Sequence, residues 1–66
     1  MKGPLTKPTV KLVGEDGNAF SIMGRVKKAL MLAGADKEYA DKYLKEATSG
    51  DYDHLQVVSM EYVDVE

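Results

Sequence analysis

Residues 18–34 of this 66-residue chain read Asn18-Ala-Phe-Ser-Ile-Met-Gly-Arg-Val-Lys-Lys-Ala-Leu-Met-Leu-Ala-Gly34. Asn18 suits an N-cap, and Gly34 suits the left-handed residue that closes a last helical turn. Between them, apolar residues at steps of three and four share one side of a helix: Ala19, Ile22, Met23, Val26, Ala29, Leu30 and Ala33. We therefore predict one helix between the two caps, with a core-facing side that the rest of the chain covers.

The dipeptide Asp16-Gly17 allows a second interpretation of how this segment begins. It is typical of a two-residue hairpin turn, after which Phe20 and Ile22 would alternate in a returning strand. The helix is preferred because the apolar spacing continues to Ala33, which is too long for a strand, and because the composition favours a helix. At this point residues 19–23 remain open between the two.

Two further helices are expected downstream. Asp36 and Asp51 each suit an N-cap, Gly50 suits the C-cap of the second helix, and the third helix is expected to end near Glu61. The second helix would bury the face made by Tyr39, Ala40, Tyr43, Leu44 and Ala47. The third would bury a narrower stripe, formed by Tyr52, Leu55, Val58, Ser59 and Tyr62.

Short alternating segments lie toward both ends of the chain. Thr9–Val13 and Tyr62–Val65 have the period-two pattern of strands. Two prolines within residues 1–8 predict an extended or disordered arm there, and residues 9–66 form one compact domain. The fold class is therefore α+β: a single small β-α-α-α-β domain, with three helices and a two-stranded sheet formed by the chain ends.

Composition excludes several kinds of chemistry. The chain has one histidine and no cysteine, so it lacks thiolate nucleophiles, cysteine-ligated zinc sites and multi-histidine metal sites. Its beginning has no apolar run typical of a signal peptide, and no segment has the length of a membrane span. A net charge of −2 argues against a general nucleic-acid binder. We expect a cytoplasmic protein with no cofactor, metal or membrane contact.

Charge is distributed unevenly along the chain. Lys2, Lys7 and Lys11 are the only charged residues before Gly14, whereas every formal charge from Asp51 onward is acidic. The simpler interpretation is that the two chain ends lie close together and attract one another. The alternative is an acidic tail that meets a basic partner.

Three segments resemble a known group of sequences. They are Val13-Gly14-Glu15-Asp16-Gly17-Asn18-Ala19-Phe20, Gly24-Arg25-Val26 and Ala47-Thr48-Ser49-Gly50-Asp51-Tyr52-Asp53-His54-Leu55. This pattern resembles a small family of short bacterial and phage or plasmid proteins. The resemblance implies a bacterial or mobile-element source and a compact α+β fold, and it implies no activity. Family members tend to carry charged residues where this chain has Met31 and Leu32.

Met31 and Leu32 lie away from the core-facing side of the first helix, and Met31 shares a flank with Phe20. Either the other helices bury this apolar last turn, or it is exposed as a contact patch for a homodimer or another protein. In the second case Val57 and Met60, which lie off the main stripe of the third helix, would extend the patch.

Glycine and basic residues occupy the middle of the same helix. Gly24 costs about 1 kcal/mol relative to alanine, which predicts that a neighbouring element crosses closely there. Arg25, Lys27 and Lys28 are candidates for contact with a nucleic-acid backbone. The next helix would be the recognition helix of a helix-turn-helix, but its carboxylates would repel phosphates.

Asp51, Asp53 and His54 form the one group that is able to carry chemistry, as a general base or in a metal site. Each has an ordinary role as well, because Asp51 is a cap, Asp53 is favoured in a first turn, and His54 is expected as an exposed or flanking residue. No serine stands in a nucleophile motif. We therefore expect a small non-catalytic interaction protein, and as the alternative a weak nucleic-acid-binding accessory protein.

Overall fold

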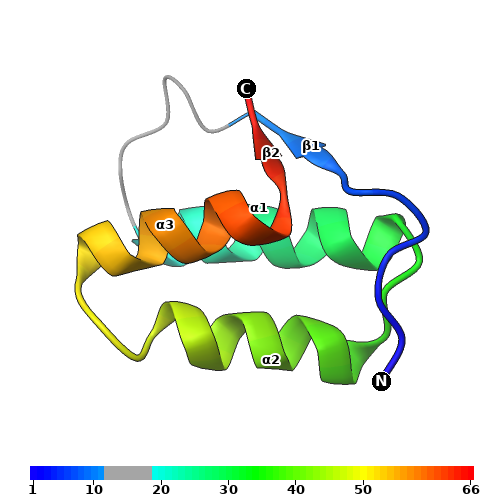
Figure 1. The fold of residues 1–66 in the computed structure, drawn as a ribbon, viewed down its shortest axis with the longest axis horizontal. Coiled ribbons are helices and arrows are strands. Elements are labelled where there is room, and N and C mark those ends of the chain that lie inside the picture. The colour runs from blue at the N-terminus through cyan, green and yellow to red at the C-terminus, as the bar shows by residue number, and fades with distance from the viewer. Residues whose placement is uncertain (12–18) are drawn as a thin grey trace.

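The computed structural model describes residues 1–11 and 19–66 (Figure 1). Its elements follow the order β-α-α-α-β, which confirms the predicted fold class. They are β1 (Thr9–Val10), α1 (Ala19–Leu32), α2 (Lys37–Ala47), α3 (Tyr52–Tyr62) and β2 (Asp64–Val65).

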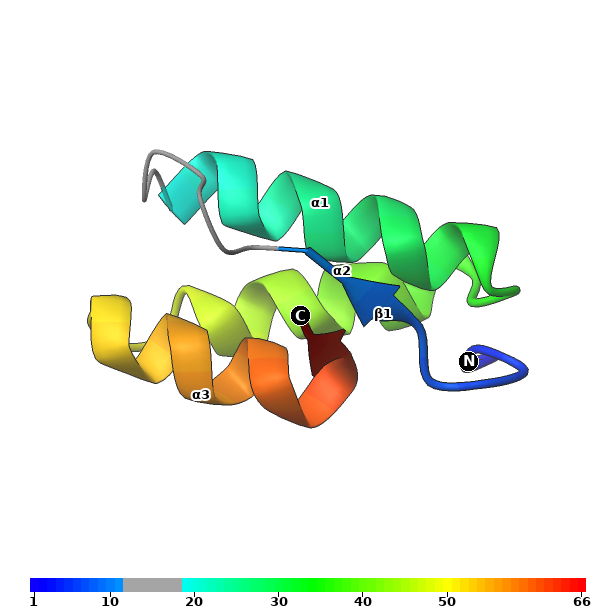
Figure 2. The ribbon, with the colours of Figure 1, turned by 90° about the horizontal axis from the view of Figure 1, so that it is seen from above.

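The helices form a bundle that the sheet covers on one side. In Figure 1, α2 runs along the bottom, and the strands lie on the side of α1 and α3 that faces away from α2. Figure 2 views the molecule from above and shows the strands between α1 and α3, which flank them. The outer surfaces of α1 and α3 therefore belong to different sides of the molecule.

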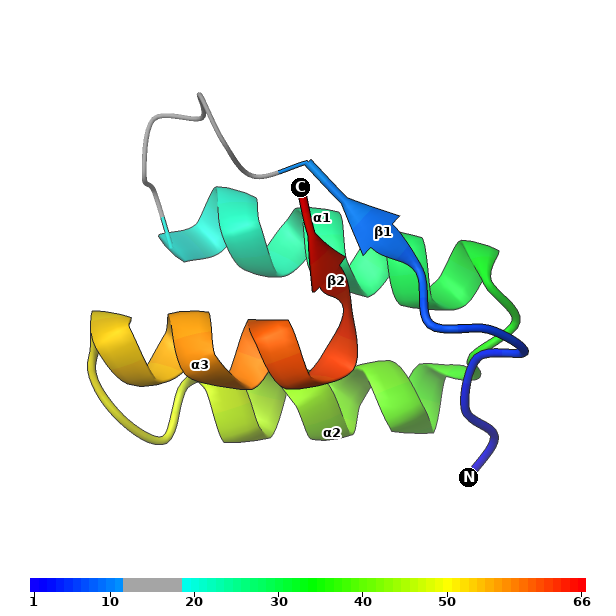
Figure 3. The same ribbon diagram turned by 45° about the horizontal axis from the view of Figure 1, so that its top comes forward.

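The strands β1 and β2 run parallel and pair the two ends of the chain (Figure 3). Thr9 is opposite Asp64, and Val10 is opposite Val65. The backbone N–H of Asp64 donates to the carbonyl oxygen of Pro8 at 2.9 Å. A parallel pair needs a long crossover connection, which the three helices supply. The predicted pairing of the chain ends is thus confirmed.

Only the beginning of the first predicted strand can be compared with the structure. Strand pairing spans Thr9–Val10, and Lys11 is already outside it. The expected continuation to Val13, the turn at Asp16-Gly17 and the Asn18 N-cap lie outside the described residues.

The start and end of α1 resolve the first alternative. Because the helix begins at Ala19, the hairpin interpretation of residues 19–23 is wrong. At the other end Gly34 has a φ of +108°. Its N–H donates to the carbonyl oxygen of Met31, and the N–H of Ala35 donates to the carbonyl oxygen of Leu30. These bonds form a Schellman motif, so Gly34 closes the helix as predicted.

The core lies where the three helices and the sheet meet. Val26, Leu30 and Val63 are completely buried, and Tyr43 is the largest fully buried side chain. The Tyr43 hydroxyl lies 2.7 Å from the Ser59 hydroxyl, which is also fully buried, so each polar group has a partner. This hydrogen bond joins α2 to α3 inside an otherwise apolar interior.

Tyr62 joins α3 to α2 at the edge of that core. Its ring packs edge-on against Tyr39 and Tyr43 with centroid distances of 5.6 and 5.1 Å. Its hydroxyl donates a hydrogen bond to the Glu46 carboxylate. Burial, and then the carboxylate of Glu46, raise the pKa of Tyr62 well above its usual value.

Both predicted aspartate N-caps are confirmed. The Asp36 carboxylate accepts the N–H of Tyr39 at 2.8 Å, and the Asp51 carboxylate accepts the N–H of His54 at 2.9 Å. The Tyr39 N–H bond stabilises the charged form of Asp36 and lowers its pKa. The last helix ends at Tyr62, one residue beyond the position expected from the sequence.

The predicted C-cap of α2 was wrong. Thr48 takes that position, with a φ of −93°, and both its N–H and its hydroxyl donate to the carbonyl oxygen of Leu44. Gly50 has a different purpose. A Cβ atom there would lie 2.8 Å from Cγ of His54, so glycine makes room for the histidine ring.

Residues 1–8 pass over the connection between α1 and α2. The N–H of Leu5 donates to the carbonyl oxygen of Ala33, and the N–H of Asp36 donates to that of Lys2, both at 2.9 Å. Further along, the Lys7 ammonium lies 3.4 Å from the Asp64 carboxylate, so the oppositely charged ends do meet. Both side chains are exposed, and such a pair contributes about 0–1 kcal/mol.

Candidate interaction surface

The outer side of α1 carries large apolar side chains that the fold does not bury. Phe20 is 81% exposed, Leu32 is 79% exposed and Met31 is 44% exposed. The opposite side of the same helix supplies the core residues Ile22, Met23, Val26 and Leu30. Burial of Met31 and Leu32 by the other helices, one of the two sequence-based interpretations, is therefore wrong. The exposed patch of the other interpretation remains, and its role as a contact surface stays a prediction.

Gly24 lies in the middle of this outer side. A Cβ atom placed there would meet no heavy atom within 4 Å, so no element in residues 1–11 or 19–66 makes the predicted close crossing. Instead, Gly24 helps to line a shallow, open hollow of about 330 Å³ together with Lys27, Lys28, Met31 and Leu32. The glycine thus leaves a surface depression open, and no contact among the described residues requires a glycine there.

Basic side chains border the hollow. Between Ala19 and Leu32 the helix has Arg25, Lys27 and Lys28 and no acidic residue. Arg25 and Lys28 are exposed, and Lys27 is half-buried. Within residues 1–11 and 19–66, no carboxylate forms an ion pair with either lysine. The residues proposed for protein contact and those proposed for nucleic-acid contact therefore share one surface. We call it the α1 face and define it as Phe20, Gly24, Lys27, Lys28, Met31 and Leu32.

Val57 and Met60 lie on a different surface. They are 51% and 53% exposed, and they occupy the side of α3 opposite its buried residues Leu55, Val58 and Ser59. Figure 2 shows α1 and α3 on opposite sides of the strands. The expectation that Val57 and Met60 extend the patch of Met31 and Leu32 is therefore wrong.

Acidic residues border this second surface. From Tyr52 to Tyr62 the helix carries Asp53 and Glu61 and has no lysine or arginine. Both carboxylates are exposed. We define the α3 face as Asp53, Val57, Met60 and Glu61. Its own side chains combine apolar surface with negative charge, whereas those of the α1 face combine it with positive charge. The Lys7 ammonium, which pairs with Asp64, also donates to the carbonyl oxygen of Met60 at 3.3 Å.

The side chain of His54 holds the connection between α2 and α3. Its Nε2 atom lies 3.0 Å from the carbonyl oxygen of Glu46 and 3.1 Å from the Ser49 hydroxyl. Because a carbonyl oxygen only accepts, Nε2 carries the hydrogen in this arrangement. The Asp51 carboxylate is likewise engaged as a cap. His54 and Asp51, which the sequence offered as candidates for chemistry, thus make structural contacts. The partners of the His54 ring, Glu46 and Ser49, could not be recognised from the sequence.

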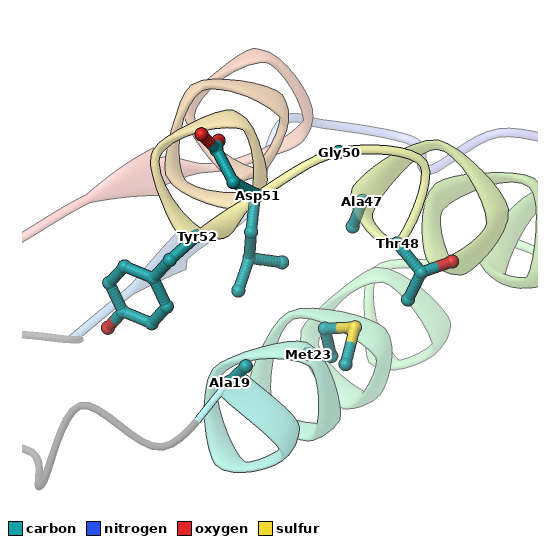
Figure 4. Close-up of a pocket in the computed structure, with 8 residues that line it drawn as sticks. Ala19, Met23, Ala47, Thr48, Gly50, Asp51 and Tyr52 are labelled. Carbon is teal, nitrogen blue, oxygen red and sulfur yellow. The ribbon is translucent and has the colours of Figure 1, made fainter.

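A second hollow, of about 260 Å³, opens beside this connection (Figure 4). Ala19 and Met23 of α1 line one side, and the other side is lined by Ala47, Thr48, Gly50, Asp51, Tyr52 and Leu55. The carboxylate of Asp51 points away from it in Figure 4. The hollow is lined mainly by apolar side chains and offers no convergent set of polar groups, so we assign no ligand to it.

Neither a metal cluster nor a membrane-spanning helix is found in the part of the chain that the structure describes. Among these residues, no three acidic or histidine side chains are grouped so as to hold a metal ion. No helix in the same ranges has both the length and the apolar character needed to cross a lipid bilayer.

Comparisons with protein-family models, curated proteins and solved structures gave no match for this chain. The sequence resemblance described above therefore stays a prediction, and function must be argued from the two faces themselves.

Proposed function

We propose that this protein is a small, non-catalytic interaction protein that binds another protein surface through the α1 face. The observation that carries the proposal is the exposed Met31 and Leu32 beside a helix glycine that no contact among the described residues requires. Exposed apolar residues that cluster around a hollow are typical of contact surfaces.

Burial of apolar surface would favour a protein partner. Complete burial of an exposed side chain contributes about 1.5–3 kcal/mol; Leu32, which is 79% exposed, can supply most of this, and Met31, which is 44% exposed, less than half of it. Lys27 and Lys28 at the border would select an acidic partner and repel a basic one.

A photoreactive amino acid in place of Leu32 tests this proposal in cells that express the protein. We expect ultraviolet light to attach a protein, either another chain or a second copy, at this position. The matched control places the same probe at Lys42, which is exposed on α2. Adducts at neither position, or equal adducts at both, would contradict the proposal.

The alternative function is weak binding to nucleic acid through Arg25, Lys27 and Lys28. It is supported by the absence of any acidic residue in α1. Binding should then weaken with increasing salt, and Lys27→Ala with Lys28→Ala should reduce both affinity and salt dependence. Fluorescence anisotropy with labelled DNA and RNA measures this, and nucleic-acid adducts at position 32 would favour this function over the first.

We also propose that the protein works in the cytoplasm of a bacterium or of the host of a phage or plasmid. This proposal is supported by the cysteine-free composition and by the sequence resemblance.

A further inference from the structure

We propose that the α1 face of one copy of this chain binds the α3 face of another copy, in a head-to-tail arrangement. This inference rests on the proposed interaction function and names its partner: a second copy, presenting an acidic and apolar helix surface.

The two faces match in polarity. Each face presents two exposed apolar side chains. They are Met31 and Leu32 on the α1 face, and Val57 and Met60 on the α3 face. The hollow beside Gly24 offers open space on the α1 face. An unbranched side chain such as that of Met60 suits such a depression, because it adapts to irregular gaps.

The two faces also match in charge. Lys27 and Lys28 on the α1 face would lie near carboxylates of the α3 face, either Asp53 or Glu61. A symmetric contact between two α1 faces would instead bring the lysines of both copies together, and like charges in a contact are unfavourable. Charge therefore favours α1 against α3 over α1 against α1.

The position of the two faces determines what kind of assembly results. Because α1 and α3 flank the strands, each copy has both faces available at once (Figure 2). A contact between two different surfaces of the same chain is heterologous, and it propagates into a ring or an open chain. The proposed assembly thus grows with concentration and does not stop at a dimer.

Two blocking variants test the arrangement in sedimentation equilibrium. Met31→Lys with Leu32→Lys blocks the α1 face, and Val57→Glu with Met60→Glu blocks the α3 face. All four side chains are exposed, so both variants should keep the wild-type circular dichroism spectrum. We expect the wild type to exceed 7.3 kDa increasingly with concentration, and each variant alone to stay at 7.3 kDa.

Mixing the two blocked variants provides the decisive result. Each retains the face that the other lacks, so the mixture should form a one-to-one pair of twice the monomer mass and nothing larger. The matched control exchanges two exposed charges on α2, Asp41→Lys with Lys42→Glu, and should associate like the wild type.

Charge-reversal variants give a second test that leaves the apolar residues in place. Lys27→Glu with Lys28→Glu, and separately Asp53→Lys with Glu61→Lys, should each reduce self-association at least tenfold at low salt. Mixed together, the two variants should associate again, because both types of contact between them then join opposite charges.

Three results would overturn the arrangement. The wild type stays at the monomer mass up to millimolar concentration, the α3-blocked variant still associates alone, or the mixed variants remain monomeric. If the wild type is monomeric while the probe at Leu32 attaches to a different protein, the head-to-tail contact is wrong and the proposed interaction function stands.

Discussion

Gly24 is expected to lower the stability of the helix that contains it, and no contact among the described residues accounts for its presence. Replacing it by alanine should raise the free energy of unfolding by about 1 kcal/mol, because alanine has the higher helix propensity and the added Cβ meets no atom within 4 Å. Urea unfolding at a protein concentration low enough to keep the chain monomeric measures this change.

Gly34 is the matched control for that substitution. Its φ is +108°, and an alanine Cβ at this position would lie 3.3 Å from the Leu5 side chain, so alanine is unfavourable there. Gly34→Ala should therefore lower the free energy of unfolding by about 1 kcal/mol or more. If Gly24→Ala also destabilises the monomer, the fold requires glycine at position 24, which contradicts our inference.

The hydroxyl pair of Tyr43 and Ser59 is the buried polar contact of the core. Tyr43→Phe leaves the Ser59 hydroxyl buried without this partner, and we expect a loss of about 1–3 kcal/mol in urea unfolding. Adding Ser59→Ala should recover part of that loss, because no hydroxyl is then left unpaired. Equal stability of the single and double variants would contradict this role.

Residue types with a single local purpose could be predicted from the sequence. Asp36, Asp51 and Gly34 each act within a few residues of their own position, and all three were placed correctly. Gly24 and Gly50 were misread because a glycine shows only that space or conformation is needed. Which neighbour requires it, or whether any does, depends on contacts made across the fold.

The connection between α2 and α3 is held by Gly50 and His54 acting together. A methyl group at position 50 would lie 2.8 Å from the ring, so Gly50→Ala should destabilise the protein by about 1–3 kcal/mol. The double variant Gly50→Ala with His54→Ala should lose less than the sum of the two single losses, since the clash needs both side chains. Thermal unfolding of the four proteins measures this coupling, and strict additivity would show that the ring does not pack there.

Ionisation of Tyr62 at alkaline pH is expected to weaken the contact between α2 and α3. Its pKa is raised above the ordinary value of 10.0, so the folded state holds this proton more tightly than the unfolded state. The contribution is complete below pH 10.0 and is lost as pH rises toward the folded-state pKa. Urea unfolding measures the free energy of unfolding at about pH 8 and at about pH 11. The decrease between these two pH values should be smaller for Tyr62→Phe than for the wild type. An equal loss in both would contradict the raised pKa.

The helices were predictable because three-and-four spacing and caps are local signals, whereas their mutual placement is not. Nothing in the spacing of Val57 and Met60 showed that α3 would present them on a different side from Met31 and Leu32. The parallel direction of β1 and β2 was also beyond the sequence, because it depends on how three helices return the chain.

For the molecule as a whole, the inner sides of the helices explain the fold, and their outer sides carry the association that we propose. The buried sides of α1 and α3 meet α2 and the sheet, and their exposed sides carry opposite charge around apolar residues. Folding therefore leaves two surfaces of opposite charge uncovered, and these are the surfaces that we propose to pair.

Amide chemical shifts of the wild-type protein, recorded over a dilution series, would detect contact between these two surfaces residue by residue. We predict concentration-dependent shifts in two separate groups of residues, Gly24 to Leu32 and Asp53 to Glu61, with Lys37–Ala47 unchanged. Shifts that do not depend on concentration, or that follow β1 and β2 instead, would contradict the pairing of the α1 face with the α3 face.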